Sequence, residues 1–161
     1  MSTYENLLDE AHKQSIEVYE MPMLHRNKGL YSDGIIWVNK YTSDTVCKAC
    51  ILAEELGHHH TSSGDILDQR DVRNRKQELR ARQWAYQCMI PLDRIVQAHY
   101  ARISGRYDLA EYLGVTEEFL QAAINRYTEK YGQSVRADER HIILFDPLGV
   151  FELFSGIEEA N

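Results

Sequence analysis

The sequence predicts an α+β fold, with a small antiparallel sheet and a buried helix followed by further helices. Residues 16–20 alternate apolar and polar side chains, as a half-buried strand does. Two more short apolar segments flank an Asp-Gly turn, which is typical of a β-hairpin. Residues 45–60 then have helical spacing and are apolar on most sides up to residue 53, which indicates a buried helix.

The first half of the chain contains the sheet. Residues 3–14 are amphipathic, since Leu7, Leu8 and Ala11 recur on one helical face. Pro22 ends the first strand, and Asp44 is a good N-cap for the buried helix. The hairpin predicted around Asp33-Gly34 joins strands over 29–31 and 35–38.

The second half is helical and ends in a hairpin. Glycine, serine and proline divide it into segments whose apolar residues have helical spacing. The predicted helices cover about 68–89, 92–103, 108–113 and 117–131, and the hairpin strands cover 140–145 and 150–154. We interpret residues 1–161 as one domain with three parts: 1–60 with the first helix, sheet and buried helix, 68–131 with the helices, and 132–161 with the hairpin and tail.

Composition excludes several classes of protein. A net charge of -7 and a pI near 5.5 disfavour a protein that binds nucleic acid directly. We expect no membrane span, because no apolar run approaches the roughly 20 residues that one requires. The N-terminus lacks the features of a signal peptide, so we expect a cytoplasmic protein. Its oligomeric state stays open.

The cysteines predict neither a disulfide framework nor a metal ribbon. Cys47 and Cys50 have C-x-x-C spacing, but only Cys88 remains, and a zinc ribbon requires a second pair. Both residues lie in the apolar helical segment, where cysteine behaves as a small hydrophobic residue. We interpret them as core residues.

The most informative residues lie at the end of the buried helix. The H-E-x-x-H motif of zinc peptidases places two histidine ligands on one helical face, with a glutamate that activates water. Here the corresponding residues are Glu54-Glu55-Leu56-Gly57-His58, so a glutamate replaces the first histidine. Carboxylates in a buried helix are costly unless a cation or a metal compensates them. This cost predicts a functional site independently of the motif.

The chain resembles the ImmA/IrrE family of metallopeptidases over roughly residues 4–131. The resemblance implies a zincin-like fold, with zinc between the motif helix and the next helix. It also implies a cytoplasmic protein of a phage or mobile element that cleaves a DNA-binding repressor. The residues that carry it are 51–59 of the motif helix, 29–31 and 35–36 before it, and 84–85, 89–91 and the helix-turn-helix-like 109–116 after it.

Two positions depart from the pattern of the family. Glu54 stands in place of the first histidine ligand. The third ligand of the family is usually a glutamate eleven residues before the proline that matches Pro91, and this position is Arg80 here. The nearest glutamate is Glu78, which is about 200° away around an ideal helix.

The departures leave two hypotheses open. In the first, Glu54, His58 and Glu78 hold Zn²⁺, with Mn²⁺ as an alternative metal, and Glu55 is the general base of an endopeptidase. In the second, Glu54 and Arg80 form an ion pair in the place of the metal, and the protein binds a regulator without cleaving it.

Other candidate residues carry weaker signals. His59 and His60 are spare ligands or favour the dipole of the helix C-terminus. The acidic residues at 65, 68 and 71 are alternative oxygen ligands or helix caps. The basic stretch over 70–82 is a solvated helix face or a docking surface for an acidic partner. The helix-turn-helix-like segment is too acidic to bind DNA alone, and we expect it to pack beside the motif helix.

Overall fold

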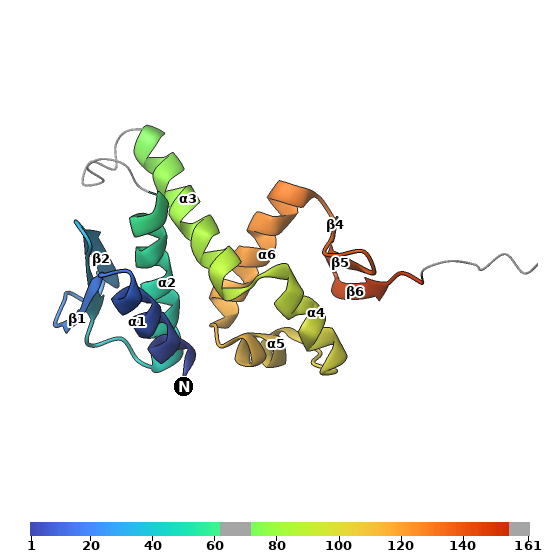
Figure 1. The fold of residues 1–161 in the computed structure, drawn as a ribbon, viewed down its shortest axis with the longest axis horizontal. Coiled ribbons are helices and arrows are strands. Elements are labelled where there is room, and N and C mark those ends of the chain that lie inside the picture. Colours follow the sequence, from blue (N-terminus) through green and yellow to red (C-terminus); the bar gives the residue numbers. More distant parts are fainter. Residues whose placement is uncertain (62–71, 155–161) are drawn as a thin grey trace, which may run out of the picture.

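The computed structural model describes residues 1–61 and 72–154 and shows a mixed α+β architecture (Figure 1). A small sheet with two helices forms one end, and helices with a second small sheet form the other. In chain order the elements are α1 (Thr3–Lys13), β1 (Glu17–Met21), β2 (Gly29–Ser32), β3 (Ile35–Asn39), α2 (Thr45–Thr61), α3 (Val72–Met89), α4 (Leu92–Tyr100), α5 (Arg106–Leu113), α6 (Glu117–Tyr131), β4 (Ser134–Arg136), β5 (His141–Phe145) and β6 (Leu148–Glu152).

The first sheet has the strand order β1-β3-β2, with β3 in the centre. Its apolar residues Ile36 and Val38 are fully buried, which explains why β3 takes the central place. The prediction of an antiparallel sheet was wrong for one pair, since β1 runs parallel to β3. The connection after β1 leads to β2 at the opposite edge of the sheet, so the two consecutive strands are not neighbours.

Helix α2 begins where its N-cap predicts. The amide of Cys47 donates to the carboxylate of Asp44 at 2.7 Å. The helix packs against α1, β2, β3 and α3, and the side chain of Leu52 is fully buried in this core. The interpretation of the cysteines as core residues is confirmed for Cys50, which is buried, whereas Cys47 is only partly buried.

Helix α3 connects the two ends of the molecule (Figure 1). Its first half lies beside α2, and its last residues reach α6, where the Tyr127 hydroxyl donates to the carbonyl of Ile90 at 2.7 Å. Gly114, with φ of 71°, separates α5 from α6 as predicted. The predicted terminal hairpin is present as β5 and β6, and β4 adds a third strand that the sequence did not indicate.

Candidate metallopeptidase site

The motif residues lie on the side of α2 that approaches α3 and the first sheet. Glu54 and His58 are one helical turn apart and therefore share a face, while Glu55 lies toward β2. His58 is buried, with 9% of its surface exposed, and both glutamates are partly buried. Helix α2 therefore presents three chemically active side chains in its last two turns.

Helix α3 brings Glu78 to this face. Oε1 of Glu78 lies 3.3 Å from Nε2 of His58. Two ligands of a tetrahedral zinc ion, each about 2.0–2.1 Å from the metal, are about 3.3 Å apart. The predicted ligands His58 and Glu78 thus come from different helices and have the separation that a shared cation requires.

A glycine allows the two helices to come this close. A Cβ atom on Gly57 would lie 2.2 Å from the carbonyl oxygen of Ala81 in α3, much closer than any real contact. Only a residue without a side chain fits here. His58 follows this glycine and Glu78 lies one turn before Ala81, so the close approach positions both ligands.

The predicted ion pair between Glu54 and Arg80 was wrong. Arg80 is exposed, and within residues 1–61 and 72–154 no ion pair joins it to Glu54. The cations that act on Glu54 are Arg82 and Lys28, which oppose the rise of its pKa. Helical geometry explains this: Glu78 and Arg82 are four residues apart on the side of α3 that faces α2, whereas residue 80 is rotated away by about 200°.

Carboxyl groups crowd the site, and Arg82 and Lys28 offset their charge only in part. Burial, together with the neighbouring carboxylates of Glu54 and Glu78, raises the pKa of Glu55 to about 8. Burial also raises the pKa of Glu54. It lowers the pKa of His58, whose Nδ1 is buried without a hydrogen-bond partner among the described residues. Three carboxylates around a histidine that stays neutral form an environment that a bound cation would stabilise.

Strand β2 forms the wall of the site next to Glu55. A Cβ atom on Gly29 would lie 2.8 Å from Oε1 of Glu55, so the strand backbone passes directly over the carboxylate. The Tyr31 hydroxyl lies 3.0 Å from Nδ1 of His59, and it accepts a hydrogen bond of 3.3 Å from the backbone amide of Gly34. The resemblance includes residues 29–31 and the basic stretch includes Arg82, but neither gives Gly29, Tyr31 or Arg82 a role in the site, because only the packing of β2 and α3 against α2 brings them there.

The other histidines of α2 have structural contacts. His59 bonds to Tyr31, and the exposed ring of His60 stacks on Trp84 with a centroid distance of 4.5 Å. The acidic candidates at positions 65, 68 and 71 and the first cations of the basic stretch lie outside the described residues.

The three candidate ligands Glu54, His58 and Glu78 meet only some of the requirements of a metal site. Across the described ranges, no group of three or more His, Cys, Asp or Glu side chains has the spacing of a complete metal site. His58 and Glu78 have ligand spacing, and Glu54 is close enough to Glu78 for the charge of one to affect the pKa of the other. One imidazole and two carboxylates are donor types that zinc and manganese ions accept, and a bound cation would have to draw Glu54 closer to the other two.

The family model of the IrrE N-terminal-like domain matches residues 11–125. The chain belongs to this family, as its sequence resemblance to ImmA/IrrE proteins indicates. The family is one of zinc-dependent metallopeptidases, and the match includes α2, α3 and β2. No individual curated protein matches the chain. No helix within the described residues has both the length and the apolar character that a membrane crossing requires.

Proposed function

We propose that the protein is a metal-dependent endopeptidase that cleaves a protein substrate, a transcriptional repressor of a phage or mobile element. The observation that carries this proposal is the 3.3 Å separation of His58 Nε2 and Glu78 Oε1 across the contact between α2 and α3. Family membership supports the reaction type. The repressor and the cytoplasmic location rest on the resemblance to ImmA/IrrE proteins alone.

The substrate chain would bind along β2. This strand lies at the edge of its sheet and pairs only with β3 among the described strands. An edge strand has free amide and carbonyl groups that an extended peptide pairs with, which positions a scissile bond. Because Gly29 of β2 lies against Glu55, such a peptide would pass beside the carboxylate.

Glu55 would be the general base. Its side chain makes no hydrogen bond to the described residues and lies in an environment that raises its pKa to about 8. Bound cationic charge would favour the ionised form, which accepts a proton from water and later returns it to the leaving amine. Its place between α2 and β2 keeps it next to the substrate backbone and away from bulk water.

Glu54, His58 and Glu78 would hold the metal. When bound, the metal polarises the scissile carbonyl and activates a water molecule. One imidazole and two carboxylates are accepted by Zn²⁺, and this oxygen-rich set also suits Mn²⁺. Helices α2 and α3 would keep His58 and Glu78 in place, and Glu54 would move toward them when the metal binds.

A second candidate function is metal-free binding of a regulator protein. The charges of Arg82 and Lys28 act on Glu54, which gives this carboxylate cationic neighbours without a metal. The replacement of the first histidine by Glu54 agrees with this alternative, in which the fold of a peptidase is kept for recognition.

Metal content of the purified full chain separates the two functions. We expect about one Zn²⁺ or Mn²⁺ per chain by elemental mass spectrometry, after purification without chelator or affinity tag. Glu54→Gln, His58→Ala and Glu78→Gln should each lose it, while the exposed control Arg80→Ala should keep it. If the wild-type protein stays metal-free after incubation with Zn²⁺ and Mn²⁺, the proposal that it is a metal-dependent peptidase is rejected.

Catalysis is tested with Glu55→Gln. This variant should keep the metal and lose cleavage of the proposed repressor substrate, because Gln cannot accept a proton. Cleavage that continues in Glu55→Gln would remove Glu55 from the role of base while leaving the metal site intact.

A further inference from the structure

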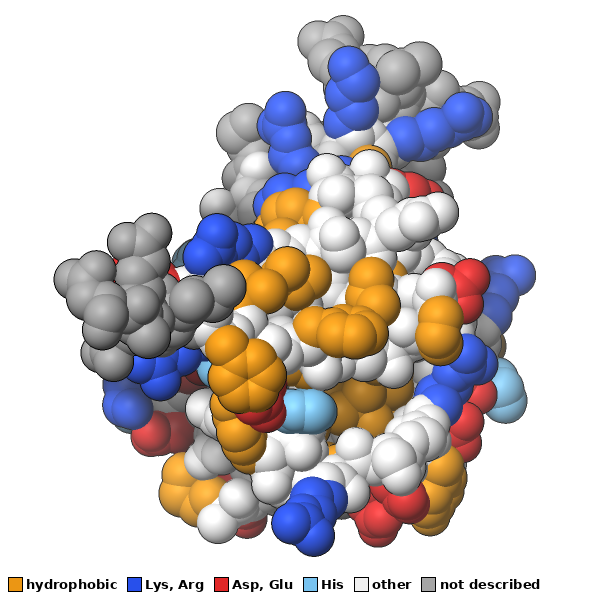
Figure 2. Space-filling view, turned by 90° about the vertical axis from the view of Figure 1, so that its right-hand side faces the viewer, with side chains coloured by type: hydrophobic (Ala, Val, Ile, Leu, Met, Phe, Trp, Pro, Cys, Tyr) orange, Lys and Arg blue, Asp and Glu red, His pale blue; other side chains and the backbone are white. Residues whose placement is uncertain are grey.

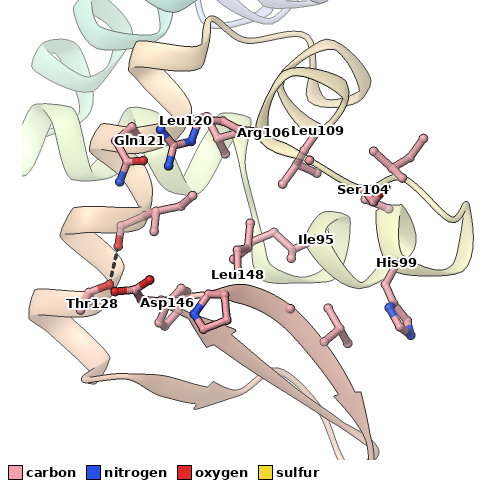
Figure 3. Close-up of a pocket in the computed structure, with 18 of the residues that line it drawn as sticks. Ile95, His99, Ser104, Arg106, Leu109, Leu120, Gln121, Thr128, Asp146 and Leu148 are labelled. Atoms are coloured by element: carbon pink, nitrogen blue, oxygen red, sulfur yellow. Dashed lines mark hydrogen bonds between the residues drawn. The ribbon is translucent and has the colours of Figure 1, made fainter.

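A cavity lies at the end of the molecule opposite the metallopeptidase site, between α4, α5, α6 and the β5–β6 hairpin (Figure 3). Its volume is about 780 Å³. Pockets that bind small organic ligands have volumes of about 300–1,000 Å³. The face that contains this end of the chain shows apolar side chains gathered near its centre (Figure 2).

Core side chains form the inner wall of the cavity. Leu120 of α6 is fully buried, Ile95 of α4 is 3% exposed and Phe145 of β5 is 3% exposed. Leu148 and Val150 of β6 cover the opposite side, and both are only partly buried. The exposed parts of Leu148 and Val150 gain free energy when an apolar group displaces their water.

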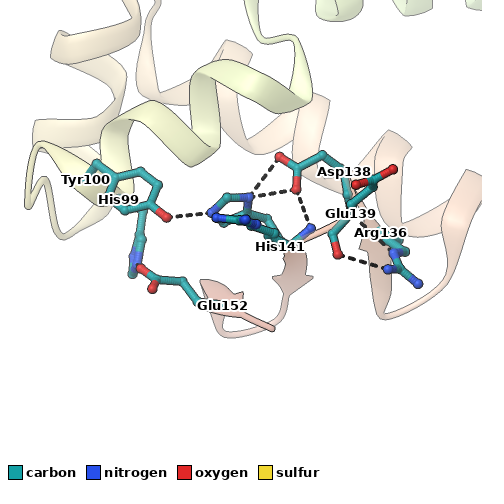
Figure 4. A network of polar contacts seen from close by, with 8 residues as sticks. His99, Tyr100, Arg136, Asp138, Glu139, His141 and Glu152 are labelled. Carbon is teal, nitrogen blue, oxygen red and sulfur yellow. Dashed lines mark hydrogen bonds and ion pairs between the residues drawn. The ribbon is translucent and has the colours of Figure 1, made fainter. Parts of the chain in front are cut away.

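The hairpin wall is tied firmly to α4 (Figure 4). Nε2 of His99 lies 3.2 Å from Oε1 of Glu152, and the Tyr100 hydroxyl lies 2.7 Å from Nε2 of His141. Nδ1 of His141 in turn lies 2.7 Å from the carboxylate of Asp138. Because an ionised carboxylate only accepts hydrogen bonds, Nδ1 of His141 donates to Asp138. These contacts fix the hairpin against α4.

The hairpin lies beyond the residues that match the family model. The match to the IrrE N-terminal-like domain ends at residue 125, whereas the wall residues of the cavity include 145–150. The cavity therefore forms where the family domain meets the C-terminal strands.

Arg106 supplies the cationic side chain of the cavity. Arg106, the first residue of α5, and Asp146, between β5 and β6, both line it (Figure 3). Within the described residues, neither side chain forms an ion pair. The guanidinium of Arg106 attracts an anionic group, and an apolar body fits against the partly exposed side chains of the hairpin.

We propose that this cavity binds a small amphipathic carboxylate, with its anionic group at Arg106 and its apolar chain against Leu148 and Val150. The site is separate from Glu55 and His58, so the proposal does not rest on peptidase activity.

Octanoate and its uncharged analogue octanamide are suitable probes, at concentrations below the micelle range. With the full chain, we expect saturable binding of octanoate at one site by calorimetry. Backbone amide resonances of α6 and the β5–β6 hairpin should shift in ¹H–¹⁵N spectra. Arg106→Gln should weaken octanoate binding by about tenfold or more, since a charge-assisted hydrogen bond is lost. Octanamide should bind more weakly than octanoate and should not respond to Arg106→Gln.

Matched variants separate the cavity from the general surface. Leu148→Trp should fill the cavity and abolish binding, whereas Phe151→Trp, at a position that is 57% exposed and not in the cavity wall, should not. Arg102→Gln removes an exposed arginine from the loop before α5 and should change affinity by less than about twofold. Absence of saturable binding, equal affinity for octanamide, or shifts confined to other elements would each overturn the proposal. The wild-type spectra locate the ligand even if a tryptophan variant fails to fold.

Discussion

Gly57 of α2 touches the backbone of Ala81 in α3, at the place where the two helices are closest. This contact determines which residues of α3 face the motif helix. Glu78, one turn before Ala81, lies 3.3 Å from His58 of α2, and Arg82 lies 3.9 Å from Glu78, whereas Arg80 is exposed. The relative position of the helices thus explains both the His58–Glu78 pair and the absence of the predicted pair with Arg80.

Gly57→Ala should destabilise the protein by about 3 kcal/mol, because a backbone has to move to accommodate the methyl group. The shift should also separate His58 from Glu78 and lower metal affinity. Urea unfolding measures the first effect, and metal titration of the folded variant measures the second. Gly149→Ala is the matched control, since a Cβ there meets nothing within 4 Å. Equal stability of the two variants would contradict the close approach of the helices.

The local elements could be predicted from the sequence, because their causes are local. The Asp-Gly turn, the Asp44 cap and the glycine between α5 and α6 are each read from adjacent residues. The parallel pairing of β1 with β3 could not, because it depends on where a distant strand lies. The position of Arg80 could not be predicted either. It was expected at the site because it lies eleven residues before Pro91, but the contact of Gly57 with Ala81 determines which side of α3 faces α2.

Arg80→Ala should change the free energy of unfolding by no more than about 0.5 kcal/mol, as is usual for an exposed residue. Chemical denaturation at neutral pH measures this value. A buried ion pair with Glu54 predicts a loss of about 3–5 kcal/mol instead, because the carboxylate would lose its partner. A loss of that size would therefore restore the ion-pair hypothesis.

The pH dependence of stability should report Glu55. Its pKa is about 8 in the folded protein and about 4.5 in its ordinary state. Since the folded state binds the proton more tightly, this group contributes stability below pH 4.5 that is lost as the pH rises toward 8. In chelator, Glu55→Gln should therefore be more stable than wild type by about 2–4 kcal/mol at pH 8. The difference should fall below about 1 kcal/mol at pH 5.

Stability curves of both proteins in urea at several pH values test this prediction. The matched control is Glu111→Gln, which changes an exposed carboxylate on α5 and should leave the pH dependence as in wild type. Parallel curves for wild type and Glu55→Gln across the whole range would show that Glu55 ionises normally in the folded protein.

The chemical part of the site could be predicted further than its geometry. Glu55 and His58 follow from the motif, and the cost of burying carboxylates in an apolar helix is itself a reason to expect a cation. Gly29 and Tyr31 gave no such signal, since a glycine and a tyrosine in a short strand have many ordinary explanations. Their role depends on β2 lying against α2, which is a tertiary contact.

Thiol labelling should distinguish the two cysteines of the C-x-x-C sequence. Burial raises the pKa of the Cys50 thiol to about 11, and it raises the pKa of the less buried Cys47 thiol by a smaller amount. Because only the thiolate reacts, native protein at pH 8 should be alkylated at Cys50 much more slowly than at Cys47, by about tenfold or more. Trypsin cleavage after Lys48 separates the two residues for mass spectrometry, and urea-unfolded protein, in which both should react alike, is the control. Rapid alkylation of both in the native state, or a disulfide between them, would show a reactive pair and contradict the burial of Cys50 in α2.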